Sequence, residues 1–327
     1  MDKGFAALQL EAAAFKRSAF SESTKASYRS HRNAYLRFCL YFSLVPVPAS
    51  QITLKTYVAF LARSIKSSGI NGYLNIVRIM HLEAGLENPL CSNFELNMVK
   101  RGVSRQLGSP VKQMLPLSVT ILRDLYSCYD MCETADVCFW AALILGFFGM
   151  LRKSSLLLKF SNSAQEMGLC RYDVADLSDE SFVLNVRRSK TNQFGQRVHR
   201  IPFVSCSEAC LCPVRSLLAH LVASKLPSSS NLFAYCKSGR SLILNHADFV
   251  SKLRRGLGMI GLNPGLYSGH SMRRGGCTMG YAAGLSVVDL KLRGDWHSNA
   301  VEQYLFVPGA QIVSAARIMS EFAAQSE

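Results

Sequence analysis

The sequence predicts a mainly α-helical protein with a small β-sheet, divided into two domains. Apolar residues recur at helical spacing through most of the chain, and strand-type alternation is confined to residues 181–204. The 327 residues exceed the roughly 100–200 residues of a typical domain. Because 49% of the residues are hydrophobic and 18% are charged, the chain can build packed cores, which excludes a disordered protein.

The first domain is expected to be all-helical and to span residues 1–108. Residues 4–20 have the pattern of an amphipathic helix, and Ser23 or Thr24 is the expected N-cap of a helix that runs to Phe42. Ser67-Ser68-Gly69 is expected to be a loop. After the proline-rich stretch at residues 45–48, further helices are expected to begin at Ser50, Gly72 and Asn93.

A linker is expected at residues 109–116, followed by a second domain at residues 117–327. Residues 181–186 and 198–204 alternate and flank a glycine-containing turn, which predicts a hairpin with Lys190 close to the turn. Residues 134–149 are almost entirely apolar and therefore predict a buried helix. The other expected helices cover residues 118–128, 213–225, 247–257, 270–283, 286–292, 299–306 and 310–324.

The charge balance points to a polyanion as partner. Lys and Arg number 37 against 22 Asp and Glu, which gives a net charge of +15, and the first third is the more basic per residue. Such a protein most often binds nucleic acid, although charge for solubility alone is the alternative. The longest apolar run, Val137 to Leu151, is too short to span a bilayer, and no signal peptide is evident. A soluble, intracellular protein with no membrane partner is expected.

The eleven cysteines are scattered along the chain, so reduced thiols are expected rather than a disulfide framework. The one dense group of three is Cys206, Cys210 and Cys212. Their spacing lacks a second ligand pair at zinc-finger distance, and His199 and His220 are isolated. Structural cysteines are therefore favoured over zinc ligands, and no metal site is predicted.

Four segments of the second domain have an unusual sequence. Arg152 ends the segment Gly-Phe-Phe-Gly-Met-Leu-Arg, and Lys190 lies in Arg-Arg-Ser-Lys-Thr at the hairpin. His270 and Arg273 belong to Gly-His-Ser-Met-Arg-Arg-Gly-Gly. Gly-Asp-Trp-His begins at residue 294, and Tyr304 follows it along the chain.

This order of Arg, Lys, His-x-x-Arg, a glycine-led segment and Tyr resembles the tyrosine recombinases, the phage-integrase-like enzymes that break and rejoin DNA. The wording of the last two segments is most similar to recombinases of DIRS-like, Ngaro and Crypton mobile elements. The resemblance covers nearly the whole chain. It implies an N-terminal helical core-binding (SAM-like) bundle, an α+β catalytic domain, nuclear localisation in a eukaryotic host, and no metal or nucleotide cofactor.

The resemblance also implies roles for single residues. Tyr304 attacks the scissile phosphate to form a 3′-phosphotyrosyl link, and Arg152 and Arg273 bind its oxygens. Lys190 suits a general acid, with Lys153 or Arg188 as alternatives, and His270 suits proton transfer to or from Tyr304.

Each of these residues also has a structural alternative. Arg152 alone could be a helix C-terminal cation, and Lys190 a solvated hairpin lysine. His270 could be a cap residue, and Tyr304 could belong to the core. Tyr267 and Tyr281 are further candidate tyrosines.

The chain departs from the family pattern at two positions. Ser155 stands where the family usually has an acidic residue, three positions after the first arginine. Asp295 stands at the third His/Trp position, nine residues before Tyr304, and an aspartate cannot donate a neutral N–H. The neighbouring Trp296 or His297 is therefore a candidate for that role.

The expected partners are double-stranded DNA and further copies of the chain. The resemblance implies a tetramer on two duplexes, with the C-terminal helix docking on a neighbouring subunit or packing on its own domain. A domesticated, non-catalytic DNA-binding protein and a type IB-like topoisomerase are the alternative functions. The candidate phosphate contacts are Lys25, Arg29, Arg32, Lys100, Arg101, Arg105, Arg188 and Arg274. For Arg274, a structural pair is the alternative.

Overall fold

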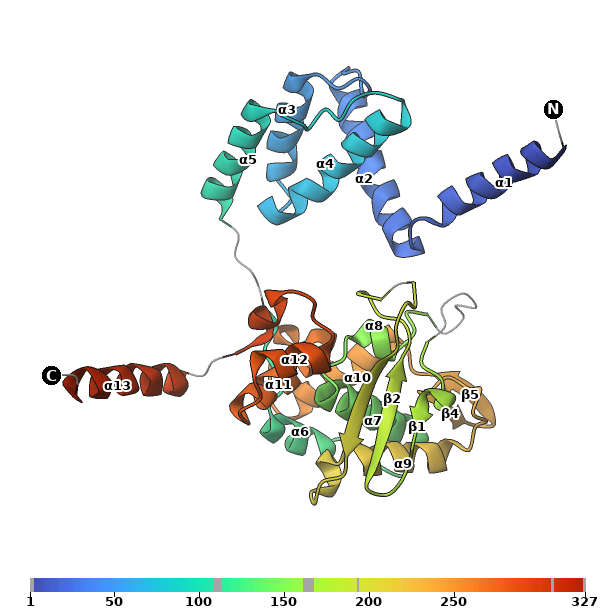
Figure 1. Cartoon of the computed structure of the whole chain (residues 1–327), viewed down its shortest axis with the longest axis vertical. Helices are drawn as coiled ribbons and strands as arrows, with labels where there is room; N and C mark the ends of the chain where they lie inside the picture. Colours follow the sequence, from blue (N-terminus) through green and yellow to red (C-terminus); the bar gives the residue numbers. More distant parts are fainter. Residues whose placement is uncertain (1–2, 109–112, 161–167, 193, 307–308, 326–327) are drawn as a thin grey trace. The chain divides into compact units, whose positions relative to one another are not determined.

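The computed structural model describes residues 3–108, 113–160, 168–192, 194–306 and 309–325. It consists of two compact units, residues 1–112 and 113–327 (Figure 1). Both units are mainly helical, and the strands of the described residues belong to the second unit, so the predicted fold class is confirmed. Residues 109–112 of the expected linker lie outside the described residues.

The first unit packs its helices around an aromatic core that contains Tyr35 and Tyr57, with ring centroids 5.0 Å apart. Two expectations about helix starts are wrong. Ser21, and not Ser23 or Thr24, is the N-cap of α2, because its hydroxyl accepts the N–H of Thr24. The helices are α1 (Lys3–Ser18), α2 (Glu22–Tyr41), α3 (Gln51–Ala62), α4 (Ser67–Glu83) and α5 (Phe94–Leu107).

The second wrong expectation is the loop at Ser67-Ser68-Gly69, which forms the first turn of α4. Ile70 and Leu74 are buried against the core, so tertiary packing extends the helix backwards over residues that have low helix propensity. The Ser67 hydroxyl donates a hydrogen bond to the carbonyl of Gly108 at 3.1 Å, which ties this start to the end of α5.

The second unit is built around the buried helix α7 (Thr134–Phe148), as predicted. Helices α9 and α11 and strand β4 pack against α7. The other helices are α6 (Val119–Tyr126), α8 (Lys153–Leu156), α9 (Pro213–Ser224), α10 (His246–Met259), α11 (Gly269–Ala282), α12 (Val287–Gly294), α13 (Gly309–Gln325), and the 3-10 helices η1 (Arg171–Asp173), η2 (Ala209–Leu211), η3 (Pro264–Leu266) and η4 (Asn299–Tyr304). Residues 299–304 thus form a 3-10 helix rather than the expected α-helix.

The predicted hairpin is confirmed as β2 (Ser181–Val186) and β3 (His199–Val204). The strands pair antiparallel, with Phe182 opposite Phe203 and their rings stacked at 4.8 Å, and β1 (Val174–Ala175) extends the sheet. A second sheet, β4 (Ala234–Lys237) with β5 (Arg240–Ile243), was not predicted. Its strands are too short to show the alternation on which strand prediction depends.

Two adjacent glycines let α11 lie directly on the segment that precedes α6 and on α7. A Cβ atom on Gly275 would be 2.1 Å from the carbonyl oxygen of Leu117, and one on Gly276 would be 1.9 Å from that of Phe147. Only residues without a side chain fit such close backbone contacts. This approach fixes the start of α11 beside the segment that follows α7, where the cationic motifs meet.

Candidate active site

Arg152 lies between two helices rather than at the end of one. Helix α7 ends at Phe148, Met150 has a positive φ of 49°, and Arg152 is the N-cap residue of the short helix α8. Ser155 is buried, and its amide donates to the carbonyl of Arg152 at 2.8 Å. The alternative of Arg152 as a simple C-terminal cation of α7 is therefore wrong.

Arg273 is the central buried cation of the site, with only 1% of its surface exposed. Its guanidinium donates to the carbonyl of Met150 and, at 2.7 Å, to that of Gly294, so it joins three segments of the chain. Within the described residues its Nε has no partner. Burial, followed by the charge of Arg152, lowers the pKa of Arg273 to about 9, which still leaves the side chain charged at neutral pH.

Tyr304 lies at the end of η4, and its ring lies beside Trp296 and Arg273. The Trp296 and Tyr304 rings meet edge to face at 5.1 Å. The guanidinium carbon of Arg273 lies 3.6 Å from the Trp296 ring centroid and 5.2 Å from that of Tyr304. A Cβ atom on Gly294 would be 1.8 Å from the indole ring, so glycine lets Trp296 fold back onto the cluster.

His270 lies in the first turn of α11, with its ring centroid 6.5 Å from that of Tyr304. Desolvation, followed by the positive charges of Arg273, Lys153, Arg152 and Lys190, lowers the pKa of His270. The imidazole is therefore neutral at physiological pH and can accept a proton. Cations from three of the four segments thus act on one histidine, and the structure brings the predicted catalytic residues together.

Asp295 faces the hairpin rather than Tyr304. Its carboxylate accepts hydrogen bonds from the hydroxyls of Ser189, at 2.9 Å, and Thr191, and pairs with Arg197 on the return arm of the hairpin. Burial raises the pKa of Asp295, but these hydrogen bonds and the charges of Arg197 and His199 outweigh it, so the pKa lies below its usual range.

Of the three candidates for the third His/Trp position, only Trp296 lies against Arg273 and Tyr304. Its indole N–H is buried and has no hydrogen-bond partner within the described residues. His297 is exposed, lies 3.5 Å from the Asp295 carboxylate, and also contacts Arg197. The geometry therefore separates Trp296, on the tyrosine side, from Asp295 and His297, on the hairpin side.

Sequence reasoning missed Arg197, which pairs with the carboxylate of Asp295. It is 98 residues from Asp295 in sequence, and it is one of many arginines outside any motif. The hairpin prediction contained the only usable signal, because a return arm places residues 187 and 197 near each other across the turn.

The alternative tyrosines and cations lie in other surroundings. Tyr267 lines an apolar groove with Leu117 and Met279, and Tyr281 is exposed on α11. Lys153 packs its side chain over Gly269 beside His270. Arg274 is buried and donates to the carbonyl of Met114 at 2.7 Å, which favours a structural role over the predicted DNA contact. Arg188 is exposed on the hairpin.

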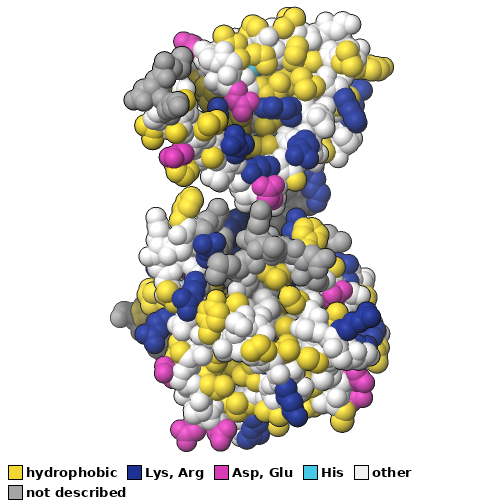
Figure 2. All heavy atoms as spheres, turned by 90° about the vertical axis from the view of Figure 1, so that its right-hand side faces the viewer, with side chains coloured by type: hydrophobic (Ala, Val, Ile, Leu, Met, Phe, Trp, Pro, Cys, Tyr) yellow, Lys and Arg dark blue, Asp and Glu magenta, His cyan; other side chains and the backbone are white. Residues whose placement is uncertain are grey.

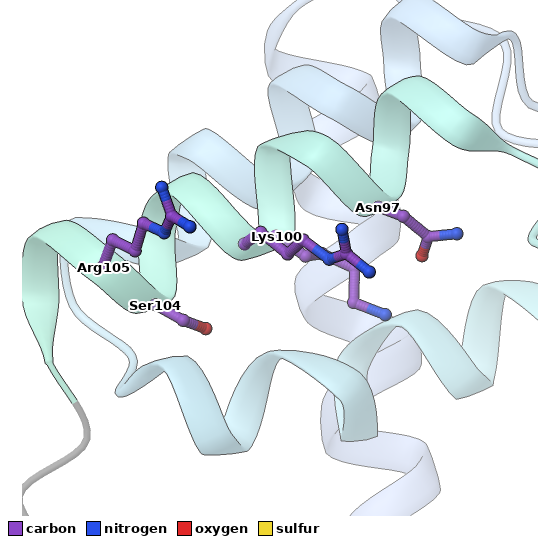
Figure 3. Close-up of a pocket in the computed structure, with 5 residues that line it drawn as sticks. Asn97, Lys100, Ser104 and Arg105 are labelled. Carbon is purple, nitrogen blue, oxygen red and sulfur yellow. The ribbon is translucent and has the colours of Figure 1, made fainter.

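Helix α5 carries a cationic surface of the first unit. Lys100, Arg101 and Arg105 line an open hollow of about 580 Å³ together with Asn97 and Ser104 (Figure 3). Lys and Arg side chains are also distributed over the visible face of both units (Figure 2).

The predicted phosphate contacts on α2 differ in their pairing. Lys25 pairs with Glu22 at 2.7 Å, and Arg32 pairs with Glu83 at 2.5 Å. Arg29 is exposed. Lys25 and Arg32 are therefore less available to a polyanion than the cations of α5.

Within the ranges that the structure describes, no group of three or more His, Cys, Asp or Glu side chains is arranged to hold a metal ion. Cys210 donates to the carboxylate of Glu208 at 3.4 Å, and Cys212 caps α9. No described helix has both the length and the apolar character that crossing a membrane requires.

Comparison with known proteins gives one relative in sequence and several in structure. No family model matches the chain. An integrase/recombinase XerD homolog from Selenomonas ruminantium is 22% identical over 263 residues, which are 79% of this chain and 73% of the relative. The lambda integrase dimer bound to a COC′ core site has a TM-score of 0.60 at 15% identity, covering 92% of this chain and 95% of that one.

The integrase of transposon Tn1549, in complex with circular intermediate DNA, has a TM-score of 0.57 at 14% identity and covers 94% of this chain and 98% of that one. The fold is therefore the mostly helical fold with small sheets that these integrases share. The chain is thus similar in fold to two integrases and in sequence to an integrase/recombinase homolog.

Proposed function

We propose that this protein is a site-specific DNA recombinase that cuts and rejoins strands through a 3′-phosphotyrosyl intermediate. The observation that carries the proposal is the contact of Tyr304 with Trp296 and Arg273, beside a His270 surrounded by cations. A tyrosine held at a cationic centre suits attack on a phosphodiester, because the same charges stabilise the phenolate and the phosphate.

In the proposed step, Tyr304 loses its phenolic proton to His270, and its oxygen forms a bond to the scissile phosphorus. The bond from phosphorus to the 5′-oxygen breaks, and the leaving oxygen takes its electron pair and accepts a proton from the Lys190 ammonium. The 3′-phosphotyrosyl bond retains the energy of the phosphodiester, so the reverse attack by a 5′-hydroxyl restores DNA without ATP.

Arg152, Arg273 and Trp296 are the proposed binding groups for the non-bridging oxygens. Guanidinium groups stay charged and can contact two oxygens at once. Arg273 donates two hydrogen bonds to main-chain carbonyls. In the described part of the site, its Nε and the N–H of Trp296 are buried donors without a hydrogen-bond partner. A phosphate oxygen would satisfy buried donors that are costly to leave unpaired.

Duplex DNA is the proposed partner of both units. The cations around the hollow of α5 are the candidate phosphate contacts of the first unit, with Arg29 and Arg188 as further contacts. The DNA complexes of the lambda and Tn1549 integrases support this partner. Because phosphate contacts carry little sequence information, a smaller set of groove contacts would select the target site.

The wording Gly-Asp-Trp at residues 294–296 supports a finer proposal, that the chain serves a DIRS-like, Ngaro or Crypton mobile element in the nucleus of a eukaryotic host. A domesticated DNA-binding protein remains the alternative, suggested by Ser155 and Asp295. A type IB-like topoisomerase is the other, and it would relax any supercoiled DNA as a monomer, whereas a recombinase requires particular sites.

Assembly into a tetramer on two duplexes is proposed from two apolar surfaces of the second unit. Helix α13 exposes Ile318, Met319 and Phe322. An apolar groove of about 470 Å³ lies elsewhere on the unit and includes Leu117 and Met279 in its lining. A second copy of α13 suits this groove, because each surface would remove the other's apolar side chains from water.

The deciding experiment traps the covalent intermediate. A pool of nicked duplexes with a randomised centre is incubated with protein in EDTA, and adducts that survive SDS are isolated and sequenced. The wild-type protein is expected to enrich a defined duplex, and Tyr304→Phe is expected to give no adduct while still binding DNA. Tyr281→Phe, at an exposed tyrosine of α11, is the matched control. Salt-sensitive binding without any adduct would favour the domesticated DNA-binding protein.

A further inference from the structure

Asp295 occupies a backbone position that usually selects a different residue. It is the C-cap of α12 in the left-handed region, at φ 56° and ψ 51°, where glycine or asparagine is the common choice. An aspartate there also carries a carboxylate with only 8% of the residue exposed. A buried charge at a strained position is retained only if its surroundings compensate it.

The compensation comes almost entirely from the β2–β3 hairpin. Ser189 and Thr191, the residues on either side of Lys190, both donate hydroxyl hydrogen bonds to Oδ2 of Asp295. Arg197, on the other arm, pairs with Oδ1. One carboxylate therefore fixes both flanks of Lys190 and the opposite arm of the same hairpin.

A second element closes the tip of this hairpin. The buried Asn192 donates through Nδ2 to the carbonyls of Arg187, at 2.8 Å, and Arg197, at 2.5 Å, and so bridges its two arms. Within the described residues, the tip is thus a closed unit that is attached to the segment after α12 through Asp295 and through a contact of Arg197 with His297. Asp295 directly precedes Trp296, so a shift at Trp296 would be transmitted to the Lys190 hairpin through one peptide unit.

We propose that Asp295 is a positioning residue that holds Lys190 where it can protonate the leaving 5′-oxygen. The inference rests on the proposed function, because it assumes the phosphodiester cleavage described above. It also gives a reason for an aspartate at the family's His/Trp position, since the adjacent Trp296 faces the tyrosine while Asp295 anchors the general acid.

The test separates proton donation from the rest of catalysis by changing the leaving group. The duplex enriched by the trapping experiment is made with an ordinary 5′-oxygen or with a 5′-bridging sulfur at the scissile phosphate. A thiol has a pKa near 8.5, so sulfur leaves without a proton donor. Single-turnover rates of adduct formation are measured for both duplexes.

Asp295→Gly keeps the left-handed backbone without strain and removes the carboxylate. We expect this variant to cleave the oxygen duplex at least about tenfold more slowly than wild type, because a general acid contributes ~10²–10⁴-fold to the rate. On the sulfur duplex, its rate is expected to approach that of wild type. Lys190→Ala shows how far the sulfur duplex restores the cleavage rate when the general acid itself is absent. The double variant Ser189→Ala with Thr191→Val is expected to be restored to a similar extent. Arg152→Lys, which alters phosphate binding, is the matched control and stays slow on both duplexes.

Two results would overturn the inference: an Asp295→Gly rate equal to wild type on the oxygen duplex, or an equal loss on both duplexes, which indicates a general structural role. Circular dichroism and thermal unfolding of the variant distinguish that loss from misfolding. An absence of adduct from the wild-type protein on either duplex would instead reject the proposed function itself.

Discussion

Trp296 is the residue that links the cationic centre to the tyrosine. Its ring contacts Arg273 and Tyr304, while its N–H points to no described acceptor. Trp140, the other tryptophan, is equally buried, but its N–H donates to the carbonyl of Cys210 at 2.9 Å. Of these two indoles of similar burial, Trp140 therefore has a hydrogen-bond acceptor for its N–H, whereas Trp296 has none within the described residues.

This difference makes a prediction about the two tryptophans. Trp296→Phe should lower the rate of adduct formation about 10–100-fold, because a hydrogen bond to a charged group is worth about 1.5–3 kcal/mol, with little change in the urea midpoint. Trp140→Phe should lower the free energy of unfolding by about 1–3 kcal/mol and leave the rate of adduct formation unchanged. Equal rates for Trp296→Phe and wild type would exclude the indole as a phosphate ligand.

Single residues also show how far the sequence alone could reach. The motif residues Arg152, His270 and Arg273 could be found because each follows a pattern with a chemical meaning, and the fold brings them together. The partners of Asp295 could not be found, because a carboxylate in a left-handed cap leaves no periodic signal. Arg274 was assigned to DNA because sequence carries no record of a guanidinium that bonds to a main-chain carbonyl.

At the scale of elements, prediction succeeded where burial imposes a period. The β2–β3 hairpin alternates buried and less buried residues, and α7 is buried along most of its length, so both were predicted. The β4–β5 sheet and the start of α4 were missed, since four-residue strands show no clear period and tertiary contacts override the low propensity of Ser-Ser-Gly.

The packing of α9 beside α7 and β4 produces a second prediction, on stability in acid. His220 on α9 is fully buried, and its Nε2 meets the carbonyl of Leu232 at 2.8 Å. Burial, and then the charge of Arg171, lowers the pKa of His220 to about 4, although the bond to Leu232 opposes this. Because the unfolded chain has the higher histidine pKa, near 6.5, it binds more protons as the pH falls.

The contribution of neutral His220 to the free energy of unfolding is therefore complete above pH 6.5. It is lost as the pH falls toward about 4, by about 3 kcal/mol in total. His220→Gln keeps a donor for the carbonyl but cannot titrate, so its free energy of unfolding from urea titrations should lose less between pH 7 and 4.5 than that of wild type. Parallel curves for wild type and His220→Gln would contradict the assignment.

For the whole molecule, the net charge of +15 predicts salt-sensitive DNA binding whose slope depends on where the cations lie. Each phosphate contact releases counterions and adds about 0.9 to the slope of log K against log salt. Lys100→Gln with Arg105→Gln, on the α5 hollow, should reduce that slope by about 2. Arg215→Gln with Lys237→Gln removes equal charge from exposed positions of the second unit and should leave the slope nearly unchanged.

Fluorescence anisotropy on one duplex from 50 to 300 mM NaCl gives these slopes. An equal reduction for both pairs would show that the charge acts through the overall field rather than through contacts of α5.

Assembly is the property that distinguishes a recombinase from a monomeric topoisomerase, and α13 gives its test. Ile318→Glu with Phe322→Glu places charges on exposed apolar positions of the helix and should leave binding and adduct formation on one site intact. In sedimentation velocity the variant should no longer join two duplexes, because a charge in an apolar groove remains unsolvated. Met279→Glu, in the proposed groove, should reproduce the defect, and Ser320→Glu on α13 should not. If all variants join two duplexes as wild type does, α13 packs elsewhere and the pairing of these two surfaces is wrong.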